Sequence, residues 1–303
     1  GRNRKKRNKL YNALALTLSA LAFASCNDFL DTMPDNRAQV DTEQKVQSIL
    51  VSAYIDHEPI MVAEIISDNV DDFGENNPNT DRWFDDTFAW KDETEDSNES
   101  LNSFWESAFV SIASANQALQ AIEELEGSTT SNTLNECKAE ALLCRAYNHF
   151  ILACMFCKHY SNSADNDLGL PYIEKPETEL NPQYKRGTLA ELYEKIDHDI
   201  QEALPLVGDS YYTVPKYHFN TKAAYAFACR FYLYYEKWEE ALKYANLCLG
   251  SQAKTMLRDW KSMANMTQQA DAITNEYINA SSNANLLLLT GFSRIGVMFG
   301  PYK

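Results

Sequence analysis

Apolar side chains recur at helical spacing along most of this 303-residue chain, and that periodicity restricts the fold more than any other feature. Residues three and four positions apart share one face of a helix, so each such stretch predicts an amphipathic helix. Ser103 with Glu106 and Thr188 with Glu191 have the spacing of capping boxes, which mark helix starts. One helix is predicted to begin at Asp41, and the others to cover residues 103–125, 133–160, 188–204, 220–235 and 238–249.

The last two of these helices carry the most specific pattern. Tyr232, Trp238 and Ala241 lie at the relative spacing of a tetratricopeptide repeat, although Glu236 stands where the repeat usually has glycine. Such a helix pair cannot bury its apolar face alone and needs neighbouring pairs. The sequence therefore predicts an all-α fold, a tetratricopeptide-like α-α superhelix with long irregular loops. The more divergent pairs are expected to be residues 103–125 with 133–160, and 188–204 with 220–235.

The first 26 residues have the layout of a bacterial lipoprotein signal. A basic segment, residues 2–9, precedes an apolar segment, residues 10–23, which is shorter than the roughly 20 residues that span a membrane. The small residues Ala24 and Ser25 follow, and then Cys26, as in a lipobox. We predict cleavage after Ser25 and a lipid anchor on Cys26. An ordinary secreted protein is the alternative, because Phe23 stands where leucine is commoner.

The charge of the chain excludes one class of partner. Six of the 27 basic residues precede Leu10, which leaves 21 basic against 43 acidic residues, a net charge of −22, after residue 25. Such a surface repels phosphate backbones, so we expect no nucleic-acid partner. The same charge favours neutral or cationic ligands over acidic polysaccharides.

No motif in the sequence indicates catalysis, a metal site or a cofactor. Cys154 and Cys157 form a C-x-x-C inside a predicted helix, with no second pair, so we expect the cysteines after Cys26 to pack in the core. The five histidines are scattered, and H-E-x-x-H, G-x-S-x-G, P-loop and G-x-G-x-x-G patterns are absent from the sequence. A surface hydrolase that uses a pair of carboxylates is the remaining alternative, and no motif supports it.

Residues 67–100 lose the helical periodicity and predict a long acidic loop with aromatic residues. Long loops are uncommon unless they are functional or disordered. Aromatic faces stack on sugar rings, and carboxylate, amide and guanidinium groups hydrogen-bond to hydroxyls. The alternative is that the aromatic residues pin the loop to the helical core. The candidate ligand-binding residues are Asp68, Asn69, Arg82, Trp83 and Trp90, beside Asp71 and Phe84.

Several short segments are specific in combination, through their order and spacing. They are residues 26–34 (CNDFLDTMP), 141–150 (ALLCRAYNHF), 169–171 (GLP), 186–189 (RGTL), 193–203 (YEKIDHDIQEA), 220–224 (NTKAA) and 238–241 (WEEA). Together they resemble the SusD/RagB family of outer-membrane nutrient-binding lipoproteins from Bacteroidetes. The resemblance extends from Cys26 to about Gly250.

The resemblance implies a binding subunit held on the outer membrane by the lipid on Cys26 and facing the cell exterior. Such proteins deliver oligosaccharides, or in some members oligopeptides, to a TonB-dependent transporter of the SusC type, with the helical repeats facing the transporter. The domain organisation that follows is a signal peptide in residues 1–25 and a SusD-like helical repeat domain in residues 26–303. Within that domain we expect the N-terminal region in residues 26–215 and the start of the C-terminal region in residues 216–303.

Overall fold

The computed structural model describes residues 40–72, 74–76, 81–127, 131–179, 182–267, 270–289, 291 and 293–295. The chain divides into two compact units, residues 1–39 and residues 40–303, and the described residues belong to the second. The predicted signal peptide, Cys26 and segment 26–34 lie outside the described residues. Those assignments remain predictions, as does the division of residues 26–303 at residue 215.

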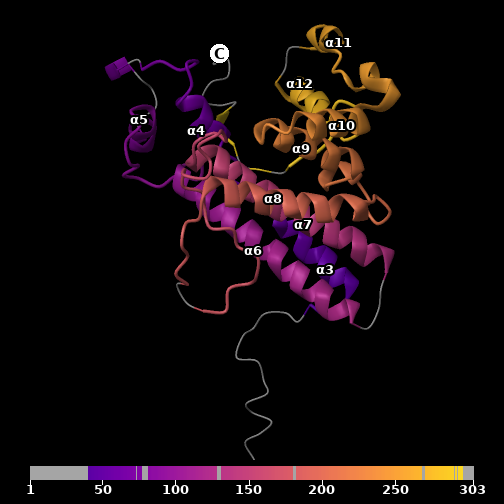
Figure 1. Ribbon diagram of the computed structural model, residues 1–303. Helices are drawn as coiled ribbons and strands as arrows, with labels where there is room; N and C mark the ends of the chain where they lie inside the picture. The colour runs from indigo at the N-terminus through magenta and orange to yellow at the C-terminus, as the bar shows by residue number, and fades with distance from the viewer. Residues whose placement is uncertain are drawn as a thin grey trace, which may run out of the picture. The chain divides into compact units, whose positions relative to one another are not determined.

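Helices make up the regular structure of the described residues (Figure 1). The only strand-like pairing in these ranges is an isolated bridge between Leu168 and Thr188, so the predicted all-α fold is confirmed. The α-helices are α3 (Glu43–Leu50), α4 (Ile60–Ile65), α5 (Arg82–Phe88), α6 (Leu101–Glu126), α7 (Asn132–Phe156), α8 (Leu189–Ala203), α9 (Thr221–Tyr234), α10 (Trp238–Leu249), α11 (Trp260–Ala264) and α12 (Ala270–Tyr277). The 3₁₀ helices are η1 (Val51–Ala53), η2 (Gly74–Asn76), η3 (Leu204–Leu206), η4 (Pro215–Tyr217) and η5 (Gly250–Met256).

Side-chain caps set the starts of α8 and α9 as the sequence predicts. The Thr188 hydroxyl accepts a hydrogen bond from Glu191 N at 3.1 Å, and the Glu191 carboxylate accepts one from Thr188 N at 2.8 Å. Asn220 Oδ1 accepts one from Ala223 N at 3.1 Å. Each cap satisfies backbone N–H groups that have no partner within the helix. The predicted starts of these helices are therefore correct to within one residue.

The start of α6 differs from the prediction. The helix begins at Leu101 with Ser100 as its cap, and the predicted capping box of Ser103 and Glu106 does not form. Ser103 N instead donates to Ser100 Oγ at 3.4 Å. Two serines three residues apart offer rival caps, and the Glu93 carboxylate favours the earlier one because it accepts a hydrogen bond from Leu101 N at 3.0 Å.

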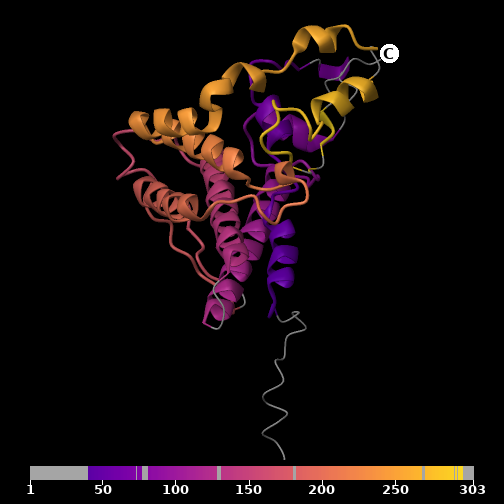
Figure 2. The ribbon, with the colours of Figure 1, turned by 90° about the vertical axis from the view of Figure 1, so that its right-hand side faces the viewer.

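The helices α6 and α7 form a long pair against which α3 and α8 pack (Figures 1 and 2). Small side chains permit helix axes to approach closely while larger neighbours interlock. The predicted pairing of residues 103–125 with 133–160 is confirmed. The alanines that these two helices bury include Ala108, Ala115 and Ala118 of α6 and Ala139, Ala141 and Ala146 of α7.

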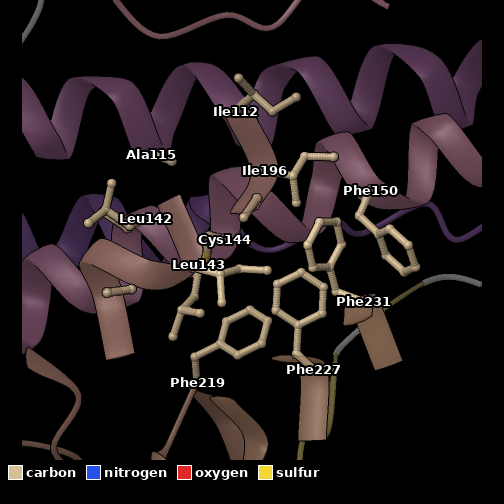
Figure 3. Close-up of a cluster of buried hydrophobic side chains, with 14 of the residues drawn as sticks. Ile112, Ala115, Leu142, Leu143, Cys144, Phe150, Ile196, Phe219, Phe227 and Phe231 are labelled. Atoms are coloured by element: carbon tan, nitrogen blue, oxygen red, sulfur yellow. The ribbon is translucent and has the colours of Figure 1, made fainter. Parts of the chain in front are cut away.

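The main hydrophobic core lies where α6, α7, α8 and α9 meet (Figure 3). Ile112 comes from α6, Ile196 from α8, and both belong to the cluster that holds Phe227 and Phe231 of α9. The ring of Phe150 on α7 lies 5.9 Å from that of Phe227 and 5.8 Å from that of Phe231, measured between centroids. Full burial of such a side chain contributes about 1.5–3 kcal/mol, so this aromatic contact joins α9 to the α6–α7 pair.

The helices α9 and α10 pack as the predicted repeat pair. Tyr244 of α10 stacks on Tyr232 of α9, with centroids 5.5 Å apart. The turn between the helices places Glu236 at a φ of 60°, the left-handed conformation that glycine adopts most easily. The turn geometry thus explains why glycine usually occupies this position of the repeat.

The predicted pairing of residues 188–204 with 220–235 is looser than a repeat pair, because α8 packs mainly on α7. Side chains of α8 contact α9 across the space between the two helices. The Tyr232 hydroxyl donates to Asp197 Oδ1 at 2.6 Å and accepts from Gln201 Nε2 at 2.5 Å. Tyr193 stacks on Phe231 at 5.5 Å. These bulky aromatic side chains fill the space between the two helix backbones.

Arg145 of α7 forms hydrogen bonds with α6, with α8 and with the linker between α7 and α8. Its Nε and Nη2 donate to the two carboxylate oxygens of Asp199 on α8, at 2.6 and 2.7 Å. Its Nη1 donates to Asn116 Oδ1 on α6 at 2.9 Å and to the linker carbonyl of Glu174 at 3.0 Å. Tyr172 of the linker also donates to Asp199. Both buried charges are thereby paired and hydrogen-bonded, which offsets the cost of removing them from water.

Candidate functional site

Residues 67–100, predicted as one long loop, contain α5 and η2. Thr94 donates to Asp86 Oδ2 from its backbone N at 3.0 Å and from its hydroxyl at 2.6 Å. Glu93 accepts a hydrogen bond from Thr87 Oγ1 at 2.7 Å. The prediction of irregular structure is wrong for residues 82–88, because these contacts with the following acidic segment stabilise a helix that has no periodic pattern of its own.

Trp83 and Phe84 pack into a second hydrophobic cluster. Their rings stack with centroids 4.1 Å apart, and only 1% of Trp83 is exposed. The other buried members of the cluster belong to α4 and are Met61, Val62 and Ile65. Of the two alternatives that the sequence leaves open, packing against the helical body is the one that these two side chains adopt. Neither ring has an open face for a ligand.

Trp90, in contrast to Trp83, is 76% exposed. Its backbone has a φ of 55°, in the left-handed region. Trp90 N donates to Thr87 O at 3.1 Å, and Lys91 N donates to Asp86 O at 2.8 Å. This is a Schellman turn at the end of α5, in which glycine usually occupies the position of Trp90. The left-handed conformation costs a non-glycine residue about 1–2 kcal/mol. The exposed indole has open faces for a ligand, which makes Trp90 the leading candidate of the predicted set.

The polar candidates of the segment are all at the surface. Asp68, Asn69 and Arg82 are exposed. Arg82 N donates to Glu95 Oε2 at 3.2 Å, which helps to hold the start of α5. Within the described ranges, these three residues and Trp90 form no hydrogen bond, ion pair or ring contact with one another. The structure therefore places these groups on one surface segment without gathering them into a preformed pocket.

A cavity of about 540 Å³ beside α4 is a feature that the sequence reasoning missed. Its walls come from α4, α7, α9 and the residues Leu287, Leu289, Gly291 and Ser293, and its polar side chains include Glu58, Tyr147 and Arg230. Met155 of α7 lines the cavity and also packs on the cluster that holds Trp83. The lining residues come from distant parts of the chain, so no local motif could have indicated them.

The cavity contains one carboxyl group with unusual acidity. Burial raises the pKa of Glu58 from 4.5 to about 7, and the nearby Arg230 guanidinium opposes this rise. Below pH 7 the carboxyl group is therefore mainly protonated and offers an O–H donor, whereas above pH 7 it is mainly a carboxylate acceptor. A mostly apolar wall with a few polar groups suits the binding of a small organic ligand.

The cysteines divide into two groups. Cys137, Cys144 and Cys248 are buried, as predicted for core residues, but Cys154 is exposed, and Cys157 and Cys229 are half-buried. The prediction of core packing is wrong for Cys154, because the last turn of α7 faces the cavity beside α4. In the described ranges, no group of three or more His, Cys, Asp or Glu side chains is placed to hold a metal ion. Among the helices of the same ranges, none combines the length and the apolar content that crossing a membrane requires.

About two thirds of the chain matches a protein-family model. Residues 28–233 match a SusD-like family whose description is "Starch-binding associating with outer membrane". No curated protein sequence matches the chain significantly.

Solved structures share the fold of the chain. A SusD superfamily protein from Bacteroides thetaiotaomicron is 21% identical, with a TM-score of 0.57 over 75% of this chain and 50% of that one. A SusD superfamily protein from Bacteroides fragilis is 18% identical, with a TM-score of 0.57 over 73% and 52% of the two chains. A SusD-like carbohydrate binding protein from Bacteroides vulgatus is 17% identical, with a TM-score of 0.56 over 73% and 47%. The chain thus spans about half the length of these structures.

Proposed function

The chain belongs to the SusD-like family, as its sequence motifs predict, and from this premise we propose that it binds oligosaccharides without breaking them down. In this proposal the bound glycan passes to a TonB-dependent transporter of the SusC type. A lipid on Cys26 anchors the protein in the outer membrane, facing the cell exterior. The family's description as starch-binding and associated with the outer membrane supports the ligand class and the location.

Trp90 is the observation that carries the proposal. Its ring is exposed, and its backbone holds a conformation that a glycine would adopt at lower cost. The flat face of an indole stacks on the apolar face of a sugar ring. Asp68, Asn69 and Arg82, exposed on the same segment, offer acceptors and donors for sugar hydroxyls. The net charge of −22 after residue 25 favours neutral glycans over acidic ones.

A pair of glycine substitutions separates the ligand role of Trp90 from its backbone strain. Trp90→Gly and Glu236→Gly each place glycine at a left-handed Schellman position, so both are expected to raise the free energy of unfolding by about 0.5–1 kcal/mol. Calorimetry with maltoheptaose and a panel of other neutral oligosaccharides measures binding. Trp90→Gly is expected to weaken binding at least roughly threefold to tenfold, and Glu236→Gly to leave it unchanged.

The outcomes of this comparison are distinct. Equal glycan affinity of Trp90→Gly and the wild-type chain would remove Trp90 from the ligand site. Binding of oligopeptides by a chain that binds no glycan would change the ligand class to peptides, the alternative that the family resemblance allows.

The anchor and the partner need their own tests. Mass spectrometry of the mature N-terminus is expected to find an acylated Cys26, and Cys26→Ser is expected to release the protein from the membrane fraction. Purification of the anchored protein from native outer membranes is expected to recover a TonB-dependent transporter with it. An unmodified N-terminus at another residue, or recovery without any transporter, would contradict the corresponding part of the proposal.

A further inference from the structure

We infer that a second pocket, formed by η1, α6, η4 and residues 288–289, binds one ring of a neutral glycan. The pocket has a volume of about 490 Å³, within the range of roughly 300–1,000 Å³ that small-molecule sites occupy. Its polar lining includes Ser52, Asp56, Ser111 and His218. The inference rests on the proposed function, and it adds a site that shares no residue with the segment 67–100.

A buried carboxylate holds the imidazole of His218 in place. The Glu140 side chain is fully buried and accepts hydrogen bonds from His218 Nδ1 at 2.7 Å, from the Tyr54 hydroxyl at 2.5 Å and from the Tyr211 hydroxyl. Tyr212 stacks on the imidazole with centroids 4.2 Å apart and planes 11° apart. Burying a carboxylate is costly unless several donors satisfy it. This network therefore fixes the ring of a histidine that lines the pocket.

The bond to Glu140 also defines what His218 offers to a ligand. Because Nδ1 contacts the carboxylate, Nε2 is the ring nitrogen left for a ligand, an acceptor in the neutral imidazole and a donor in the imidazolium. No partner of Nε2 occurs among the described residues. A sugar hydroxyl can donate or accept a hydrogen bond, so it suits Nε2 in both forms of the ring.

Three further polar groups at the pocket have unused hydrogen-bonding capacity. Asp56 Oδ1 accepts from Ser107 Oγ at 2.6 Å and from His57 Nδ1 at 2.9 Å, which leaves Oδ2 without a partner in the described ranges. The hydrogen bond from Ser107 lowers the pKa of Asp56, so the group is a carboxylate at neutral pH. The hydroxyls of Ser52 and Ser111 form no hydrogen bond with the described part of the chain. Hydroxyls that both donate and accept match the hydroxyls of a sugar.

The remaining wall of the pocket suits the apolar face of a sugar ring. Tyr217 lines it and is 49% exposed, so part of the phenol ring is open for stacking. Val51, Val110 and Leu288 supply aliphatic surface. The described lining residues include the Asp56 carboxylate and neither lysine nor arginine, which disfavours a uronic acid relative to a neutral sugar.

Two substitutions test the pocket by calorimetry, with maltoheptaose as the neutral probe and trigalacturonic acid as the acidic one. Tyr217→Ala is expected to weaken binding of the neutral probe roughly threefold to tenfold. Tyr184→Ala is the matched control, since Tyr184 is 48% exposed in the linker between α7 and α8, and it is expected to bind as the wild type does. Asp56→Asn is expected to weaken neutral binding and to strengthen binding of the acidic probe, a reversal that general loss of structure cannot produce.

The outcomes distinguish this inference from the proposed function. Weaker binding by Tyr217→Ala, with changed selectivity in Asp56→Asn, supports the pocket. Unchanged binding in both variants, in a chain that loses affinity on Trp90→Gly, would overturn the pocket and leave the proposed function standing. A wild-type chain that binds no glycan would overturn both.

Discussion

Glu58→Gln should reduce the loss of stability that the wild-type chain shows as the pH rises from acidic to alkaline. The substitution removes a carboxyl group that burial keeps protonated at acidic pH. The pKa of Glu58 rises from 4.5 to about 7 in the folded protein. Between these values the folded chain binds a proton that the unfolded chain has released. The wild-type free energy of unfolding therefore falls as the pH rises through this window.

The magnitude follows from the two pKa values. At about 1.36 kcal/mol per pKa unit, a rise from 4.5 to about 7 corresponds to about 3.4 kcal/mol at most, fully lost above pH 7. Glutamine has nearly the volume of glutamic acid and cannot ionise. The variant is therefore expected to lack this part of the pH dependence. Arg230, the cation at the same cavity, lowers the pKa of Glu58, so its removal should widen the window.

Urea unfolding at pH 5 and pH 8 measures the effect. The wild-type chain is expected to lose more stability than Glu58→Gln between these two pH values, by up to about 2.5 kcal/mol. Glu239→Gln, at an exposed glutamate on α10, is the matched control and should follow the wild type. Parallel pH profiles for the wild type and Glu58→Gln would refute the assignment of a half-buried carboxyl group with a raised pKa at the cavity.

Three other predictions concern stability. Arg145→Ala should lower the free energy of unfolding by about 3–5 kcal/mol in urea titrations, because it leaves the buried Asp199 carboxylate without its partner; a loss below 1 kcal/mol would contradict the pairing. Trp83→Ala should cost about 3–5 kcal/mol, whereas Trp90→Ala should leave thermal unfolding nearly unchanged, and equal effects would contradict their assigned environments. Glu236→Gly should raise the midpoint of urea unfolding without altering the slope, since it relieves a left-handed φ; a lower midpoint would contradict that strain.

Local sequence predicted most of the helices because their signals act within one turn. The capping box of Thr188 and Glu191 and the cap at Asn220 depend on residues three positions apart, and both occur in the structure. The start of α6 was misplaced because Ser100 and Ser103 both satisfy the local rule, and a contact from Glu93 favours the earlier one. The local capping rule therefore cannot choose between two neighbouring residues that satisfy it equally well.

The candidate site was predicted only in part. The sequence directed attention to the segment 67–100 through its composition, and Trp90 is exposed there on a strained turn. It could not indicate the cavity at Glu58 or the pocket at His218. Both are lined by residues from segments that the fold brings together, such as Ser111 of α6 and Tyr217 of η4.

By itself, the sequence determined that the chain is helical, that its last clear helices pair as a tetratricopeptide-like repeat, and that it belongs to the SusD-like family. These properties follow from spacing, caps and short motifs, which are local. Only the tertiary structure decided that Trp83 packs against α4 while Trp90, seven residues later, stands in solvent. The two residues have the same side chain in the same acidic segment, and the difference arises from the surface that each one meets after the helices have packed.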